Sequence, residues 1–212
     1  MANLDQLIDE LADEATPVRV QRAATGRLAL LGVGLATLVG VAVTYGFRLD
    51  VMQLRPPSLV AITAGLSAIL ATAAGTDAVR MARPQVGAAE SGAPWLLAAV
   101  LLVPLAALAA IAANPAESSG LAVEPGLRCL TFGLTSGVAT FLFLALWLRR
   151  GAPVNPNRAA WLAGMASGAV GALAVTLECA HVEIAHIGFW HVAVVPLFAL
   201  LGRLALPRLI RW

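Results

Sequence analysis

The sequence predicts an all-α polytopic membrane protein, a six-transmembrane-helix bundle with a short amphipathic N-terminal helix in the cytoplasm. Composition excludes a water-soluble globule, because 59% of the 212 residues are hydrophobic and only 12% are charged. Six windows of about 20 apolar residues, the length that crosses a bilayer, follow one another along the chain. These windows lack the period-2 alternation of barrel strands, which favours helices.

The first 26 residues are polar and acid-rich, and we expect them to form a segment separate from the membrane domain of residues 27–212. They lack the apolar core of a cleavable signal, so they should remain in the mature protein. After Asn3, a common N-cap residue, apolar and acidic side chains recur with helical periodicity up to Pro17. The apolar face comprises Leu4, Leu7, Ile8, Leu11 and Ala15, and the acids are Asp5, Asp9, Glu10, Asp13 and Glu14.

A helix of this length is marginal alone in water, and its acids disfavour docking on an anionic membrane surface. A partner protein with an apolar groove and a basic rim suits this helix better. The alternative, a solvated tail that packs on the protein's own loops, stays open.

The membrane domain contains the six predicted spans, which are Leu28 to Tyr45, Ser58 to Thr76, Ala93 to Ala113, Cys129 to Leu148, Ala159 to Leu177, and Ile184 to Gly202. Pro104 and Pro196 lie inside the third and sixth spans, where we expect kinks. The span centres contain no Asp, Glu, Lys or Arg, although carriers and pumps generally place ionisable groups there. A small six-helix transporter or channel is therefore the alternative function class, with weaker support.

All fourteen cations are arginines, and their placement predicts the orientation of the bundle. Eleven lie in the two terminal segments and in the loops after the second and fourth spans, and three lie in the loops after the first and third spans. Because arginine-rich loops stay in the cytoplasm, we expect both termini to be cytoplasmic. The loops after the third and fifth spans then face outward.

Cysteine and histidine are concentrated on that outer side. The stretch from Glu178 to His191 holds one of the two cysteines and all three histidines. The other cysteine, Cys129, begins the fourth span, whereas Cys179 follows the fifth, and a short loop makes these two helices antiparallel neighbours. Small residues that favour close helix approach recur on one face of each helix; they are Gly133, Ser136, Gly137 and Thr140 in the fourth span and Gly164, Gly168 and Gly171 in the fifth. Both thiols are therefore expected at one depth, on facing surfaces.

We interpret Cys129 and Cys179 as a redox- or metal-responsive pair. A static disulfide is the main alternative, and a single membrane cysteine is more often a small apolar filler. Glu178, His181 and His186 are candidate accessory residues, because they lie close to Cys179 in sequence. Glu178 would disfavour the thiolate form of Cys179, whereas protonated His181 or His186 would favour it. Zinc ligands are present among these five residues, but their spacing matches no standard zinc signature. No resident metal or other cofactor is therefore expected.

No catalytic constellation is recognisable in the sequence. The chain has no Cys-x-x-Cys pair, no phosphate-binding loop, and no grouping of nucleophile, base and acid. We therefore expect neither an enzymatic activity nor a small-molecule substrate, and no direct contact with nucleic acid.

Several short motifs in a fixed order resemble the NrsF family of membrane anti-sigma factors. They are Leu4-Asp5-Gln6-Leu7-Ile8-Asp9-Glu10-Leu11-Ala12 with Ala15-Thr16-Pro17-Val18, Arg128-Cys129, and Glu178-Cys179 with Phe189-Trp190-His191. The resemblance covers essentially the whole chain. It implies a protein of the bacterial inner membrane whose cytoplasmic N-terminal segment holds an extracytoplasmic-function sigma factor. It also implies that Cys129 and Cys179 sense heavy-metal or oxidative stress and release this partner.

On this hypothesis the protein has two kinds of partner, the lipid bilayer and the sigma factor. Apolar residues of the tail would fill a groove on the sigma factor, and acids would meet basic residues at its rim. The apolar set is Leu4, Leu7, Ile8 and Leu11, and the acidic set is Asp5, Asp9, Glu10 and Asp13.

Overall fold

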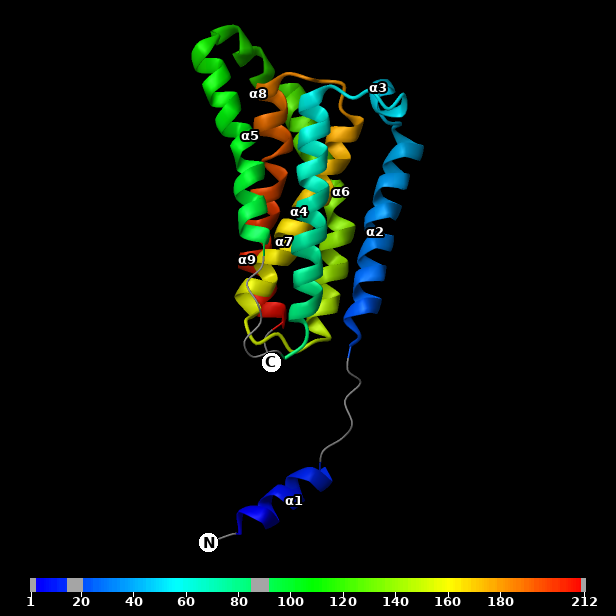
Figure 1. Cartoon of the computed structure of the whole chain (residues 1–212), viewed down its shortest axis with the longest axis vertical. Helices are drawn as coiled ribbons and strands as arrows, with labels where there is room; N and C mark the ends of the chain where they lie inside the picture. Colours follow the sequence, from blue (N-terminus) through cyan, green and yellow to red (C-terminus); the bar gives the residue numbers. More distant parts are fainter. Residues whose placement is uncertain (1–2, 15–20, 85–91, 211–212) are drawn as a thin grey trace.

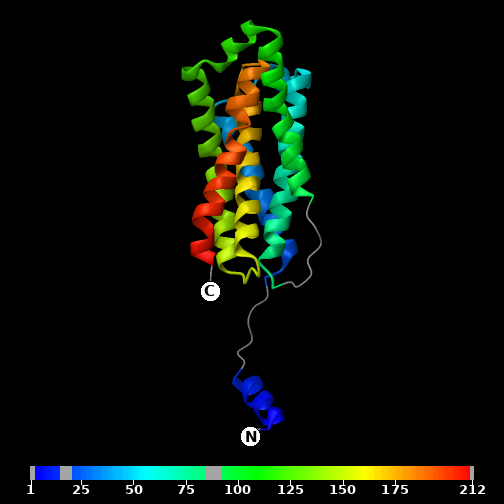
Figure 2. The same cartoon turned by 90° about the vertical axis from the view of Figure 1, so that its left-hand side faces the viewer.

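The computed structural model describes residues 3–14, 21–84 and 92–210, and all regular structure within these ranges is helical. Long helices run up and down a single bundle, of which the N-terminal helix α1 is not a part (Figures 1 and 2). The elements are α1 Leu4–Glu14, α2 Ala23–Thr44, α3 Leu49–Met52, α4 Ser58–Met81, α5 Ala93–Ala113, η1 Pro115–Leu121, α6 Val123–Arg149, α7 Pro156–Glu178, α8 Ile184–His186, η2 Ile187–His191 and α9 Val194–Ile210. The predicted all-α fold is confirmed.

Six helical segments are long and apolar enough to cross a membrane, and they overlap the six predicted spans. They are α2, α4, α5, α6, α7 and the continuous run of α8, η2 and α9. α6 begins at Val123, so Cys129 lies inside this helix and not at its start. Pro104 lies inside α5 as expected, whereas Pro196 falls in the first turn of α9. The π-helix η2 lies just ahead of α9, and in the first turn of α9 the missing amide hydrogen of Pro196 is tolerated.

α7 is the central helix of the bundle. Within its apolar window 83% of the residues are buried, against 17% in α2 and in α5. It packs on α4, α6 and α9, and Figure 2 shows it (yellow) beside α9 (orange to red). Its buried residues are mostly alanine and glycine, so the neighbouring backbones approach closely. Such close packing holds membrane helices together in lipid, where the hydrophobic effect does not drive their association.

The glycines of α7 divide between two neighbouring helices. Gly171 lies against the carbonyl oxygen of Gly133 on α6, so the expected close approach of α6 and α7 is present. Gly164 and Gly168 lie instead against the backbone of α9. The expectation that the whole glycine ridge faces α6 is therefore wrong for this part, because α7 is enclosed by several helices and its small residues serve more than one contact.

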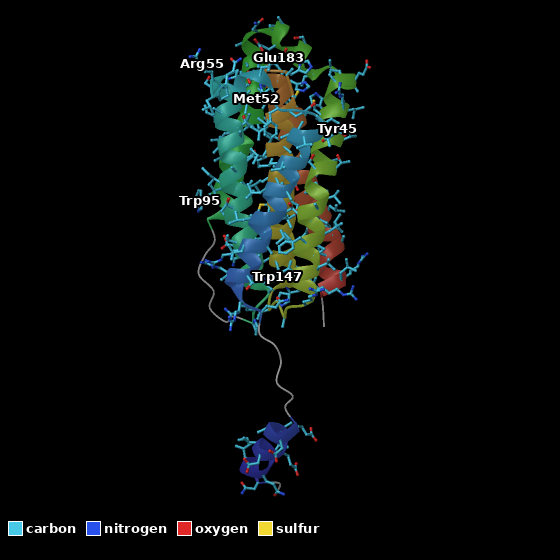
Figure 3. All side chains as sticks on the ribbon, turned by 90° about the vertical axis from the view of Figure 1, so that its right-hand side faces the viewer. Tyr45, Met52, Arg55, Trp95, Trp147 and Glu183 are labelled. Carbon is cyan, nitrogen blue, oxygen red and sulfur yellow. The ribbon has the colours of Figure 1, made fainter. Side chains whose placement is uncertain are left out.

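The two ends of the bundle differ in charge. The arginine-rich loops, after α4 and α6, lie at the same end as the start of α2 and the end of α9, here termed the inner end. Figure 3 shows Arg55 and Glu183 at the opposite, outer end, and Trp147 toward the inner end. The predicted alternation of arginine-rich and arginine-poor loops is thus present. Two arginines of that prediction, Arg19 and Arg211, lie outside the described residues.

We expect Gly171→Ala to destabilise the bundle by about 1–3 kcal/mol, because the added methyl group would overlap the Gly133 carbonyl of α6. Gly40→Ala is the matched control, since nothing lies within 4 Å of the added methyl group in α2. Alanine is the better helix former, so this control should be neutral or stabilised by up to about 1 kcal/mol. Unfolding in detergent, followed by circular dichroism, measures both changes. Equal stabilities of the two variants would contradict the described contact.

Candidate functional site

The two cysteines meet at the outer end of the bundle. Cys129 lies in α6 and Cys179 directly follows α7, and their Sγ atoms are 3.4 Å apart. Both side chains are buried, and Val175 and Phe132 pack against them. The thiols are free, but a disulfide of about 2.05 Å requires only a small movement. The proximity predicted from the helix faces is therefore present, and the sensing role remains a prediction.

Two histidines join the cysteine pair through an irregular turn. His186 ends α8, and His191 ends the π-helix η2. Residues five apart lie about 140° apart around an α-helix at 3.6 residues per turn. A π-helical turn instead closes its hydrogen bond across five residues, as the Val192 amide does to the Ile187 carbonyl. The two imidazole rings are therefore neighbours, with centroids 5.3 Å apart.

Together these residues form a buried group that we term the Cys-His cluster. Its members are Cys129, Cys179, His186 and His191, and one ligand-type atom from each lies within 4.8 Å of the other three. His186 Nε2 is 3.7 Å from Cys179 Sγ. No member is more than 7% exposed. The cluster is therefore able to form a disulfide or to present two sulfur and two nitrogen ligands to one metal ion.

His191 has one nitrogen that lacks a partner. Its Nδ1 is 3.2 Å from Thr176 Oγ1, and that hydroxyl donates its hydrogen to the Ala172 carbonyl at 2.7 Å. The hydroxyl oxygen must then accept from Nδ1–H, which places the lone pair of the neutral imidazole on Nε2. Nε2 is buried and has no hydrogen-bond partner among the described residues. A buried unsatisfied group of this kind costs about 1–3 kcal/mol of stability, and a bound ion is one of the partners that can satisfy it.

Arg48 holds the loop after α2 against the cluster. Its Nε and Nη2 donate to the two carboxylate oxygens of Asp50 at 2.6 and 2.8 Å, and its Nη1 donates to the Cys179 carbonyl at 2.9 Å. The Arg48 backbone amide also donates to the Leu177 carbonyl at 3.1 Å. The hydrogen-bonded guanidinium lowers the pKa of Asp50 below its usual value, so this carboxylate stays charged. Arg48 thus satisfies carbonyl groups at the C-terminal end of α7, where a cation is favourable.

A cavity of about 470 Å³ reaches the cysteines from the outer end. Exposed side chains of Glu124, Arg128 and His181 line it together with the two buried cysteines. Solutes on the outer side therefore have a route to the thiols.

The structure separates the predicted accessory residues. His186 belongs to the Cys-His cluster, and Glu178 lines the cavity. His181 is exposed and lies outside the cluster. Its ring stacks on the ring of His186 at a centroid distance of 4.4 Å, and its Nδ1 is 3.2 Å from Glu183 Oε2.

Sequence reasoning missed two residues of this site, His191 and Arg48. A regular helix would turn His191 away from His186, and only the five-residue spacing ahead of Pro196 hints at the irregular turn. Arg48 contacts Cys179 across 131 positions of the chain, which no local pattern reveals. Its presence on the arginine-poor side was the available signal.

α1 forms the amphipathic helix that the tail pattern predicts. It begins directly after Asn3, whose carbonyl accepts a hydrogen bond from the Leu7 amide. The apolar face is uncovered, with 46% to 70% exposure at Leu4, Leu7, Ile8 and Leu11. Exposed acids of the other faces include Asp9, Glu10 and Asp13. The Asp5 side chain and the motif Ala15-Thr16-Pro17-Val18 lie outside the described part of the chain.

The fold and the site define a six-helix membrane protein with a buried thiol and imidazole cluster at one end. A sequence model of the NrsF family, described as negative regulator of sigma F, matches residues 11–212, nearly the whole chain. The chain therefore belongs to the NrsF family, and this membership makes it a negative regulator of a sigma factor. Searches of curated proteins and of solved structures give no match.

We expect the azo oxidant diamide to join Cys129 and Cys179 within one chain, because their sulfur atoms are already 3.4 Å apart. The two thiols lose two electrons and two protons, which reduce diamide to its hydrazine. Membranes are treated, denatured in detergent and alkylated with a maleimide of known mass. Oxidised protein should take up no maleimide until a dithiol reduces it, whereas Cys129→Ser should keep its remaining thiol reactive. Labelling of both thiols after oxidation would show that they do not pair.

Proposed function

We propose that this protein is an anti-sigma factor of a bacterial inner membrane. In this proposal α1 holds an extracytoplasmic-function sigma factor on the cytoplasmic side, and the pair of Cys129 and Cys179 releases it in response to heavy-metal or oxidative stress. Family membership supports the negative regulation of a sigma factor. The excess of arginine at the inner end supports a cytoplasmic location for both termini.

The uncovered apolar face of α1 is the observation that carries the partner contact. Four large apolar side chains on one face of a short helix gain free energy only when a partner covers them. The family match begins at Leu11, so most of α1 precedes it and this contact rests on the chemistry of α1 itself. The exposed acids around the face favour a sigma-factor surface with a basic rim.

The sensing step is assigned to the two thiols. A peroxide would take up the two electrons and two protons that the thiols lose, and would be reduced to water or to an alcohol and water. Disulfide formation shortens the S–S distance from 3.4 Å to about 2.05 Å. Because α7 is packed on several sides, we expect disulfide formation to displace the loop that starts at Cys179 and to leave α7 in place.

α2 is the helix best suited to carry this displacement to α1. Arg48, just beyond its outer end, bonds the Cys179 carbonyl, and its inner end continues through residues 15–22 to α1. α2 buries only Gly26, Leu30 and Val41, and a cavity of about 180 Å³ lies between its middle and helices α4 and α7. A loosely packed helix moves at low free-energy cost. Regulation then requires two bundle states with different affinities for the sigma factor.

Leu7→Asp combined with Leu11→Asp should weaken sigma-factor binding by more than about 100-fold, because both side chains belong to the apolar face and charges there resist burial. Binding is measured with the full chain in nanodiscs against purified sigma factors of the source bacterium. Asp13→Asn, on another face, should weaken binding by less than about tenfold, mainly through slower association. The thermal stability of the bundle should not change. Unimpaired binding by the double variant would refute α1 as the contact.

Arg48→Gln should leave disulfide formation intact but abolish the effect of oxidation on sigma-factor affinity, because it removes the side-chain link between the α2 loop and Cys179. Arg55→Gln is the matched control, since Arg55 is an exposed arginine of the same loop (Figure 3). Affinity is compared before and after diamide treatment in each variant. If oxidised Arg48→Gln protein releases the sigma factor as the wild type does, the signal travels by another route.

A further inference from the structure

We propose that the Cys-His cluster is a binding site for one soft or borderline divalent cation of the Zn²⁺ or Cd²⁺ type, ligated by Cys129, Cys179, His186 and His191. The inference rests on the proposed function, because it specifies what the thiol pair senses. It also differs from the sequence expectation that no resident metal is present, in which the weighed ligand set contained His181 and omitted His191.

The spacing of the four ligand atoms fits a tetrahedral ion. Bonds of about 2.3 Å to sulfur and about 2.0–2.1 Å to nitrogen separate tetrahedral ligand atoms by about 3.3–3.8 Å. The two Sγ atoms are 3.4 Å apart, and Cys179 Sγ is 3.7 Å from His186 Nε2. All ligand-atom separations stay within 4.8 Å. Side-chain rotations that move each ligand atom by less than about 1 Å therefore complete the tetrahedral geometry. A set of two thiolates and two imidazoles is typical of zinc.

His191 is prepared as a ligand before any ion arrives. Its Nδ1–H is held by Thr176 Oγ1, which leaves Nε2 with a lone pair, buried and without a hydrogen-bond partner among the described residues. An outer hydrogen bond of this kind fixes the tautomer and orientation of metal-ligating histidines. Ligation of a cation supplies the partner that Nε2 lacks. Thr176 is accordingly a positioning residue that acts through His191.

Charge balance also favours the site. Binding of the dication displaces one proton from each thiol, and the product contains two thiolates, two neutral imidazoles and one M²⁺ ion, with no net charge. A neutral centre avoids the large free-energy cost of an unpaired charge in a buried position. The two protons leave to the solvent through the outer cavity.

The outer cavity provides the route for the ion. Glu124 and Glu178 line it, and the two cysteines lie on its buried side. Arg128 also lines it, so two acidic side chains oppose one guanidinium. The oxygen ligands attract a dication from the outer side, and the softer sulfur and nitrogen ligands beyond them hold a zinc-type ion more tightly than Ca²⁺ or Mg²⁺.

The test uses the full chain, purified in detergent with an affinity tag that contains no histidine, reduced, and freed of excess reductant. Zn²⁺ or Cd²⁺ is added, unbound metal is removed by gel filtration, and bound metal is counted by mass spectrometry. We expect one ion per chain. X-ray absorption of the wild-type Zn²⁺ protein needs no variant and should show two sulfur and two nitrogen ligands. Co²⁺ in place of Zn²⁺ should give the visible absorption of a tetrahedral centre with sulfur charge transfer.

Variants then assign the ligands. His186→Ala and His191→Ala should each weaken binding of the ion by at least about tenfold. Cys179→Ser should weaken the sulfur charge-transfer band of Co²⁺, because only Cys129 then remains as a sulfur ligand. His181→Ala is the matched control, because this third histidine stacks on His186 but lies outside the cluster. It should bind the ion within about twofold of the wild type. Thr176→Val should weaken the affinity for the ion by about 10–100-fold, and Thr176→Ser, which keeps the hydroxyl, should restore the wild-type affinity.

The outcomes separate this inference from the proposed function. The four-ligand site is wrong if the reduced wild type retains no ion, if X-ray absorption shows no nitrogen ligands, or if both histidine variants bind as tightly as the wild type. Sigma-factor binding by α1 and its release by an oxidant would survive each of these results. Conversely, a chain that binds one ion through two sulfur and two nitrogen ligands but binds no sigma factor would refute the proposed function and leave the site intact.

Discussion

The burial of α7 is the constraint on which the rest of the structure depends. A helix surrounded by neighbours in a membrane needs small side chains, because close backbone contact replaces the hydrophobic effect as the source of association. Gly171 meets Gly133 of α6, while Gly164 and Gly168 meet α9. These contacts fix the depth of α7 relative to both helices. They thereby fix the position along the bundle axis of Thr176, in the last turn of α7, and of Cys179, which directly follows α7.

The proximity of the two cysteines could be predicted from local sequence patterns. Six apolar windows, one short loop and small residues on two helix faces are local patterns, and together they place Cys129 beside Cys179. The same patterns give no information on which neighbour each small residue meets. Gly164 and Gly168 follow the helical ridge that includes Gly171, yet they pack on α9, because a helix buried on most sides presents several contact faces. Periodicity identifies a face, whereas tertiary packing selects its partner.

The histidines show a second limit of sequence reasoning. Proximity along the chain favours His181 over His191 as a neighbour of Cys179, but the structure reverses this order. The loop leaves His181 exposed beside Glu183, while the π-helical turn brings His191 beside His186 and against Thr176. The cause is a backbone irregularity ahead of Pro196, and a reading that assumes 3.6 residues per turn does not anticipate it. Arg48 has a different explanation, since its contact joins loops that only the folded bundle brings together.

The link through Arg48 has a physical property that suits a switch. Hydrogen bonds weaken steeply once the heavy-atom distance exceeds about 3.5 Å, and the bond from Arg48 Nη1 to the Cys179 carbonyl is 2.9 Å long. Disulfide formation brings the two sulfur atoms more than about 1 Å closer, and a displacement of the Cys179 carbonyl by a similar distance would break this bond. A tetrahedral ion would instead hold the sulfur atoms about 3.8 Å apart, close to their present 3.4 Å. Ion binding and disulfide formation exclude each other, since both use the same two sulfur atoms. The position of one carbonyl group would then report to α2 which of the two has occurred, without any contact between α2 and the sulfur atoms themselves.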